Sequence, residues 1–175
     1  MNLVENKLIF IVSLPRSGST FLQRILSGHP EIYAQGELWL LLDLIYLRRQ
    51  GAVCADYGPG QLADVANRFI AAHPNGESEY ARIIKRFYLD FFNTYIDSSK
   101  SWLVDKTPRY HLILPELKAA FPTAKFIVLY RDPLAVFGSY VNAMRANKLR
   151  RTDAFHLDLI DGPKHIADFY EKYSD

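Results

Sequence analysis

Apolar positions along this sequence form two patterns that alternate from one end to the other. Short continuous runs of β-branched and aromatic residues are typical of buried parallel strands, and they predict strands at residues 9–12, 102–105 and 125–130, with a further short strand at 31–35. Between them, apolar residues at helical spacing predict helices at residues 19–27, 36–49, 61–72, 78–97, 110–121, 133–148 and 163–173. This alternation predicts an α/β fold of three layers, in which helices flank both faces of a parallel central sheet.

The first two predicted helices each have a face that we expect to be buried. In the helix at residues 19–27, that face carries Phe21, Leu22, Ile25 and Leu26. The second helix follows directly from Gly36-Glu37, and its expected core positions are Leu38, Leu41, Leu42 and Ile45.

A short polar loop, Pro15-Arg16-Ser17-Gly18-Ser19-Thr20, connects the first predicted strand to the first predicted helix. Gly18 allows a tight turn and a close approach of the backbone to a ligand. The first N–H groups of a helix have no helical partner, so this junction predicts an anion site, to which Arg16 adds a planar cationic group. The alternative is an ordinary strand-to-helix turn. Ser19 stands where a Walker A loop has its lysine, which argues against a typical ATPase.

Three cationic residues follow three of the predicted strands. Arg16, Lys106 and Arg131 each lie just beyond a strand's carboxyl end, where ligands bind in parallel α/β sheets. We therefore expect them to converge on one edge of the sheet. The alternative for Lys106 is a surface turn before Thr107-Pro108, and Asp132 is interpreted as a helix cap rather than a catalytic acid.

Composition narrows the classes of function. The chain has 175 residues, of which 49% are apolar and 23% charged, and this predicts one domain over residues 1–175. A net charge of +2 argues against nucleic acid and anionic membranes as partners. The single cysteine, Cys54, fits a reducing compartment, so we expect a cytoplasmic protein. No signal peptide, membrane span or cluster of metal ligands is recognisable, and we expect no metal.

The two phosphate-binding segments resemble those of a known family. Residues 15–20 resemble the 5′-phosphosulfate loop of sulfotransferases that use 3′-phosphoadenosine 5′-phosphosulfate (PAPS). Residues 130–139 resemble their 3′-phosphate motif, in which a serine follows eight residues after an arginine, as Ser139 follows Arg131. The segment Asp105-Lys106-Thr107-Pro108 is similar to the one that lies between these motifs in the family, and the order of all three matches.

The resemblance is strongest to the branch with the protein-tyrosine sulfotransferases and many bacterial enzymes, which also carry Gly-Glu after the first helix, as in Gly36-Glu37. It implies a P-loop NTPase-like sulfotransferase fold and PAPS as co-substrate, without a metal. It also implies Glu37 as general base, with Lys106 and Arg16 stabilising the transferred sulfuryl group. The residues that it implies for binding the nucleotide are Arg16, Ser17, Gly18, Ser19, Thr20, Arg131 and Ser139.

The acceptor that the resemblance implies carries a hydroxyl group on a small molecule, a glycan or a peptide. After Glu37 the tyrosine enzymes have polar and arginine residues that hold an acidic peptide, whereas this chain has Leu38-Trp39-Leu40-Leu41, which favours a less charged acceptor. The alternative for Glu37 is a residue that only favours the helix dipole.

Two other functions are kept as alternatives: a P-loop kinase or other nucleotide-binding protein, and a nucleotide-binding domain without catalysis. Members of the sulfotransferase family are longer, so we expect the C-terminal part of their domain to be missing here. The basic residues Arg145, Lys148, Arg150 and Arg151 are interpreted as a solvated face, with the entrance to the site as the alternative.

Overall fold

Four parallel strands form the centre of the protein. The computed structural model describes residues 3–54, 56, 58–145 and 154–174. Within these ranges, β1 (Leu8–Ser13), β2 (Ile32–Tyr33), β3 (Trp102–Asp105) and β4 (Lys125–Leu129) pair in the order β2-β3-β1-β4. All pairs are parallel, and Phe10 at the centre of the sheet lies opposite Asp105 on one side and Phe126 on the other. The predicted parallel sheet is confirmed, and each predicted strand overlaps an observed one.

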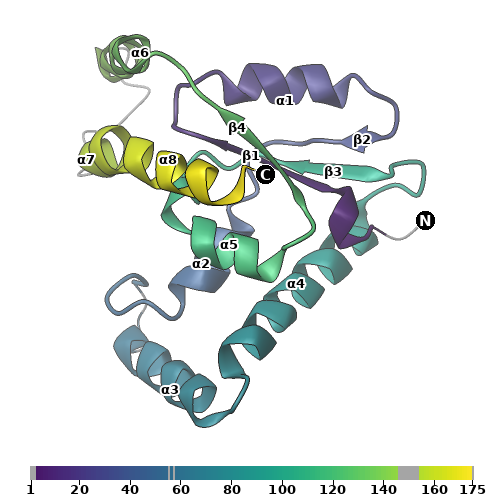
Figure 1. Cartoon of the computed structure of the whole chain (residues 1–175), viewed down its shortest axis with the longest axis vertical. Helices are drawn as coiled ribbons and strands as arrows, with labels where there is room; N and C mark the ends of the chain where they lie inside the picture. The colour runs from purple at the N-terminus through teal and green to yellow at the C-terminus, as the bar shows by residue number, and fades with distance from the viewer. Residues whose placement is uncertain (1–2, 55, 57, 146–153, 175) are drawn as a thin grey trace.

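Helices cover both faces of this sheet, as predicted. In chain order they are α1 (Ser19–Ser27), α2 (Leu40–Tyr46), α3 (Pro59–Ala72), α4 (Gly76–Tyr95), α5 (Leu114–Ala120), α6 (Pro133–Arg145), α7 (Ala154–His156) and α8 (Gly162–Tyr173). Shorter 3₁₀ turns cover Glu5–Lys7 and Tyr110–Leu112, and a π-helical turn covers Leu157–Asp161. Helix α1 lies over one face, with α6 beyond the end of β4 on the same side, while α2, α4, α5 and α8 lie on the other side (Figure 1). Helix α3 packs on α4, away from the sheet (Figure 1).

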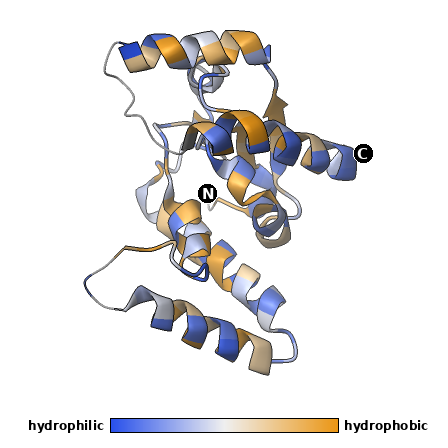
Figure 2. Cartoon of the chain, turned by 90° about the vertical axis from the view of Figure 1, so that its left-hand side faces the viewer, coloured by the Kyte–Doolittle hydropathy of each residue, from blue (hydrophilic) through white to orange (hydrophobic). Residues whose placement is uncertain are grey.

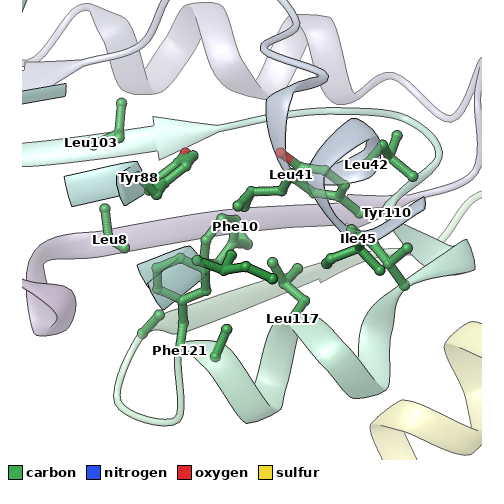
Figure 3. Packing of buried hydrophobic residues seen from close by; sticks show 14 of the residues in the cluster. Leu8, Phe10, Leu41, Leu42, Ile45, Tyr88, Leu103, Tyr110, Leu117 and Phe121 are labelled. Carbon is green, nitrogen blue, oxygen red and sulfur yellow. The ribbon is translucent and has the colours of Figure 1, made fainter. Parts of the chain in front are cut away.

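Aromatic side chains fill the layer between the sheet and α4 and α5 (Figure 3). Phe10 on β1 is completely buried, and its ring lies 5.3 Å from that of Phe121 and 6.0 Å from that of Tyr110. Tyr88 on α4 packs against both Phe10 and Phe121. The helices carry bands of hydrophilic and of hydrophobic residues (Figure 2), as expected when one face of a helix packs inward.

The predicted inner face of α1 is wrong at two of its four positions, while Leu22 and Leu26 are half-buried. Phe21 and Ile25 are 72% and 58% exposed, whereas the polar residues Ser19 and Gln23 are buried. The side chain of Gln23 donates a hydrogen bond to the backbone oxygen of Gly36 at 2.7 Å. Helix α1 therefore turns a polar side toward the protein, because that side holds the segment that leads to Glu37.

The second helix is shorter than predicted. It covers Leu40–Tyr46 rather than residues 36–49, so Glu37 lies in the segment before the helix and not in its first turn. The predicted core positions Leu41, Leu42 and Ile45 are buried, which confirms the helical face. Because Glu37 lies outside the helix, its interpretation as a residue that only favours the helix dipole loses support.

A buried carboxyl group ends β3. Asp105 is 1% exposed and accepts hydrogen bonds from the hydroxyl groups of Tyr88, Tyr110 and Thr107. Burial raises the pKa of Asp105 to about 6 from an ordinary value of 3.8, although these hydrogen bonds act in the opposite direction. Because its pKa is higher in the folded state, the group's contribution to stability is full below about pH 4 and is lost as the pH rises through about 6.

We expect the variant Asp105→Asn to remove this part of the pH dependence. Ionisation of Asp105 lowers the free energy of unfolding by about 3 kcal/mol between these two limits, and asparagine does not ionise. The measurement is urea unfolding of both proteins from pH 4 to pH 7. As the pH rises, the free energy of unfolding of the variant should increase by this amount relative to that of the wild type. A difference between the two free energies that stays constant with pH would contradict the prediction.

Candidate active site

The loop between β1 and α1 forms a turn with two left-handed residues. Arg16 has φ 69° and Gly18 has φ 95°. The N–H group of Ser17 donates to the oxygen of Leu14 at 3.3 Å, so this group is engaged within the loop. The N–H groups of Gly18, Ser19 and Thr20 lie at the start of α1, where a helix offers them no acceptor. These three N–H groups are therefore available at the position where the sequence predicts an anion site.

The two predicted phosphate-binding segments contact each other directly. Arg16 Nε donates to Ser139 Oγ at 3.2 Å, and Arg131 Nη1 donates to the backbone oxygen of Arg16 at 2.9 Å. The Arg131 contact holds the carbonyl group of a residue with a left-handed backbone. Asp132 accepts hydrogen bonds from two N–H groups at the start of α6, at 2.7 and 3.1 Å, which confirms its interpretation as a helix cap.

Glu37 and Lys106 form an ion pair beside this loop. Lys106 Nζ donates to Glu37 Oε1 at 2.7 Å, and the two side chains are 3% and 37% exposed. None of the described residues donates a hydrogen bond to Glu37 Oε2. One carboxylate oxygen therefore holds the pair together, and the other has no hydrogen-bond donor among the described residues.

A strained turn at Trp39 directs the segment that carries Glu37. Trp39 has φ 55°, which is rare for a bulky residue, and the residue is 38% exposed. The backbone N–H group of Trp39 donates to Thr107 Oγ1 at 3.2 Å, and the backbone N–H group of Leu40 donates to the oxygen of Leu38 at 2.6 Å. Thr107 follows Lys106, so the same segment after β3 positions both the turn and the lysine.

Most of the predicted site residues line one open cleft of about 910 Å³. They are Arg16, Gly18, Ser19, Thr20, Glu37, Arg131 and Ser139. Ser17 and Lys106 are buried, 6% and 2% exposed, and Lys106 meets the cleft through its hydrogen bond to Glu37. The structure thus brings together the two segments predicted to bind phosphate and the predicted general base.

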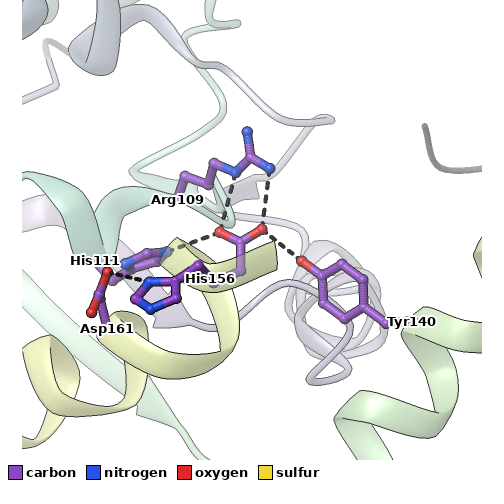
Figure 4. Close-up of polar contacts among 6 residues, drawn as sticks. Arg109, His111, Tyr140, His156 and Asp161 are labelled. Atoms are coloured by element: carbon purple, nitrogen blue, oxygen red, sulfur yellow. Dashed lines mark hydrogen bonds and ion pairs between the residues drawn. The ribbon is translucent and has the colours of Figure 1, made fainter. Parts of the chain in front are cut away.

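Sequence reasoning missed a second buried network at the same cleft (Figure 4). Asp158 is completely buried and accepts two hydrogen bonds from Arg109, at 3.2 and 3.1 Å, and one from Tyr140 at 2.6 Å. His111 Nε2 lies 3.3 Å from the same carboxylate. Burial by itself raises the pKa of Asp158, but the hydrogen bonds from His111, Arg109 and Tyr140 outweigh it and hold this pKa below its usual value.

This network fixes Arg109 in the wall of the cleft, because its Nε and Nη2 atoms donate to the two oxygens of one carboxylate. Arg109, like Lys106, is a cationic residue that follows β3, so the sequence pattern could have identified it as a candidate site residue. Asp158 had no such signal, because it follows a polar stretch and is 49 residues from its partner.

Three other expectations concern the surroundings of the site. Of the predicted basic cluster, Lys148, Arg150 and Arg151 lie outside the residues that the structure describes. In the described ranges, no group of three or more His, Cys, Asp or Glu residues is arranged to hold a metal ion. No helix in that part of the chain has the length and apolar character needed to cross a membrane.

Two curated relatives share most of this chain. The nodulation protein NoeE of Sinorhizobium fredii is 34% identical over 132 residues, which cover 74% of this chain and 30% of NoeE. A putative protein-tyrosine sulfotransferase of Caenorhabditis briggsae is 28% identical over 135 residues, which cover 77% of this chain and 43% of that protein. The chain therefore spans less than half the length of either relative.

Solved structures show the same fold. The sulfotransferase domain from the curacin biosynthetic pathway superimposes with a TM-score of 0.57 at 22% identity, over 98% of this chain and 64% of that one. The sulfotransferase STF9 from Mycobacterium avium gives a TM-score of 0.51 at 14% identity, over 95% of this chain and 56% of that one. In sequence, the model of the sulfotransferase family matches residues 9–174, and this chain therefore belongs to that family.

Proposed function

We propose that this protein transfers a sulfuryl group from PAPS to a hydroxyl acceptor in the cleft described above. The observation that carries this proposal is the contact of Arg16 with Ser139 and Arg131, with the pair Glu37–Lys106 at the same cleft. Membership of the sulfotransferase family supports it. We also propose a cytoplasmic location, which the single, exposed cysteine supports.

The donor groups of the cleft fit a nucleotide with phosphate groups at two positions. The N–H groups of Gly18, Ser19 and Thr20 would hold the 5′-phosphosulfate at the N-terminus of α1. Arg131 and Ser139 would hold the 3′-phosphate by charge-assisted hydrogen bonds. Arg16 belongs to the first of these segments and donates a hydrogen bond to Ser139 in the second, so its positive charge would stabilise both phosphate groups of the nucleotide.

The chemistry needs a proton acceptor and positive charge near the sulfuryl group. By analogy with phosphoryl transfer, the protein mainly positions the reactants and neutralises charge on the equatorial oxygens. Glu37 Oε2 would take the proton of the acceptor hydroxyl while the acceptor oxygen bonds to sulfur and the bond from sulfur to the bisphosphate breaks. Lys106 holds the other oxygen of Glu37, so its charge lies next to the reacting groups and, with that of Arg16, would stabilise the sulfuryl group.

A sulfuryl-transfer assay with labelled PAPS, over phenols, alcohols, glycans and tyrosine peptides, tests the proposal. A second experiment compares the equilibrium binding of adenosine 3′,5′-bisphosphate with that of ATP in the presence of magnesium. We expect transfer to at least one acceptor and a preference for the bisphosphate. A preference for ATP with magnesium would instead support a kinase, and binding of the bisphosphate without transfer would support a nucleotide-binding domain.

The variant Arg131→Gln is expected to weaken binding of adenosine 3′,5′-bisphosphate about 10- to 100-fold, because one charge-assisted hydrogen bond is worth about 1.5–3 kcal/mol. Affinity for adenosine 5′-monophosphate should change much less, since it has no 3′-phosphate. The matched control is Arg86→Gln, which removes a positive charge from a 76% exposed side chain on α4. An equal loss of affinity for both nucleotides would show that Arg131 only supports the loop.

A further inference from the structure

A second cavity, of about 410 Å³, adjoins the cleft. Trp39 and Arg109 line both spaces, so these two side chains form the boundary between them. The remaining wall of the second cavity is mostly apolar and includes Leu42, Tyr46, Leu47, Val53 and Leu112. Its volume falls in the range of about 300–1,000 Å³ that is typical of pockets for small molecules.

The charges on this wall disfavour an anionic ligand. Arg109 and Asp43 are the charged residues among those described that line the cavity. The charge of Arg109 is matched by the completely buried carboxylate of Asp158. Asp43 is exposed, and no described side chain forms an ion pair with it. Arg49, whose guanidinium group contacts the lining residues Tyr46 and Leu112, is paired with Glu116. Both arginines at this wall are thus paired with a carboxylate, and Asp43 adds a negative charge, which suits an uncharged ligand and disfavours an acidic one.

The boundary between the two spaces lies next to the proposed proton acceptor. Trp39 is two residues from Glu37, and its turn is held by the hydrogen bond to Thr107. A bulky residue keeps a left-handed backbone only where its surroundings hold it there. In this turn Trp39 is 38% exposed and lines both spaces. Glu37 lines the cleft, which lies on the other side of the boundary that Trp39 and Arg109 form.

We propose that this cavity binds the body of the acceptor, and that the acceptor is an uncharged, apolar compound with a hydroxyl group. The apolar body lies among Leu47, Val53 and Leu112, against the indole of Trp39, and the hydroxyl group points past Trp39 to Glu37. The inference rests on the proposed function, because it is that function which requires an acceptor next to the cleft.

The single cysteine makes this cavity accessible to a direct measurement in the unmodified protein. Cys54 is exposed and lines the cavity, so its rate of reaction with a thiol reagent reports on occupancy. The probe is 2-naphthol, with adenosine 3′,5′-bisphosphate present. We expect saturating 2-naphthol to slow the modification of Cys54 at least ten-fold. The control probe is 2-naphthoate, which has the same rings and a negative charge, and it should give little protection.

A pair of matched variants tests the same point by binding affinity. Leu47 lines the cavity and is half-buried, and Leu47→Glu should weaken binding of 2-naphthol at least ten-fold, while adenosine 3′,5′-bisphosphate binds as before. Leu62 on α3 is 38% exposed and does not line the cavity, so Leu62→Glu should change neither affinity.

The failure of this inference differs from the failure of the proposed function. If 2-naphthol neither protects Cys54 nor binds, or if 2-naphthoate or an acidic tyrosine peptide protects equally well, the assignment of the cavity is overturned, even when sulfuryl transfer is observed. If the bisphosphate does not bind and no acceptor is sulfated, the proposed function fails instead. Protection of Cys54 would then show an apolar binding site without a sulfuryl donor, which also overturns its assignment to an acceptor.

Discussion

Replacing Glu37 with glutamine is expected to lower the rate of sulfuryl transfer by about 10²- to 10⁴-fold, the usual contribution of a general base. Glutamine has nearly the same shape, and its side-chain oxygen can still accept the hydrogen bond that Lys106 donates to Glu37 at 2.7 Å. Its amide group does not take up the proton of the acceptor hydroxyl. We therefore expect kcat to fall, with the affinity for adenosine 3′,5′-bisphosphate within about two-fold of wild type.

The matched control is Glu31→Gln. Glu31 directly precedes β2, its side chain is exposed, and no described residue pairs with that side chain. This variant should transfer at the wild-type rate. If Glu37→Gln also retains transfer, Glu37 is not the base, and the pair with Lys106 is a contact that only shapes the cleft. If its affinity for the bisphosphate is lost as well, the effect on rate reports damage to the cleft rather than to proton transfer.

The variant Asp158→Asn is also expected to have a large effect, which is a lower free energy of unfolding. The carboxylate of Asp158 is completely buried and accepts hydrogen bonds from Arg109 and Tyr140, with His111 beside it. Asparagine has one acceptor oxygen, and its NH₂ group faces other donors. Removing one partner of a buried ion pair typically costs about 3–5 kcal/mol. Because the side chain of Arg109 is 35% exposed, water compensates part of this loss, and we expect about 2–3 kcal/mol.

Urea unfolding at pH 7 measures this loss. The pKa of Asp158 lies below its usual value, so its contribution to stability is present above about pH 4 and is lost as the pH falls through the lowered pKa. The control is Asp168→Asn on α8, where the carboxylate is 58% exposed and pairs with Lys164 one turn away. That change should cost less than about 0.5 kcal/mol. Equal stabilities of the two variants would mean that the Asp158 network does not hold the wall of the cleft.

Local patterns predicted the sheet and the ends of several helices. Strands β1 and β3 are buried along most of their length and have continuous apolar runs, and β3 covers the residues that were predicted for it. Helix α1 likewise covers the predicted residues 19–27, because Gly18 marks the turn before it. Where backbone geometry overrides the apolar pattern, the prediction was wrong. The left-handed turn at Trp39 delays α2 to Leu40 and leaves Glu37 in the preceding segment.

The packing of α1 shows a second limit of prediction from local sequence patterns. Its apolar residues predicted the inner face, yet Phe21 and Ile25 are exposed and Gln23 is buried. An amphipathic pattern shows which side of a helix is apolar, but not which neighbour that side meets. Here the decisive contact is the hydrogen bond from Gln23 to Gly36, whose place beside α1 depends on the sheet order β2-β3-β1-β4.

The sequence by itself predicted that Arg16, Lys106 and Arg131 lie at one edge of a parallel sheet, since the carboxyl ends of parallel strands share that edge. Only the tertiary structure decided which side chains meet there. Lys106 contacts Glu37 across 69 residues, Arg16 contacts Ser139 across 123, and Arg109 contacts Asp158 across 49. Such contacts depend on the crossing order of strands and on the direction of each loop. Neither is encoded in local periodicity, which describes only neighbours within a turn or two of the chain.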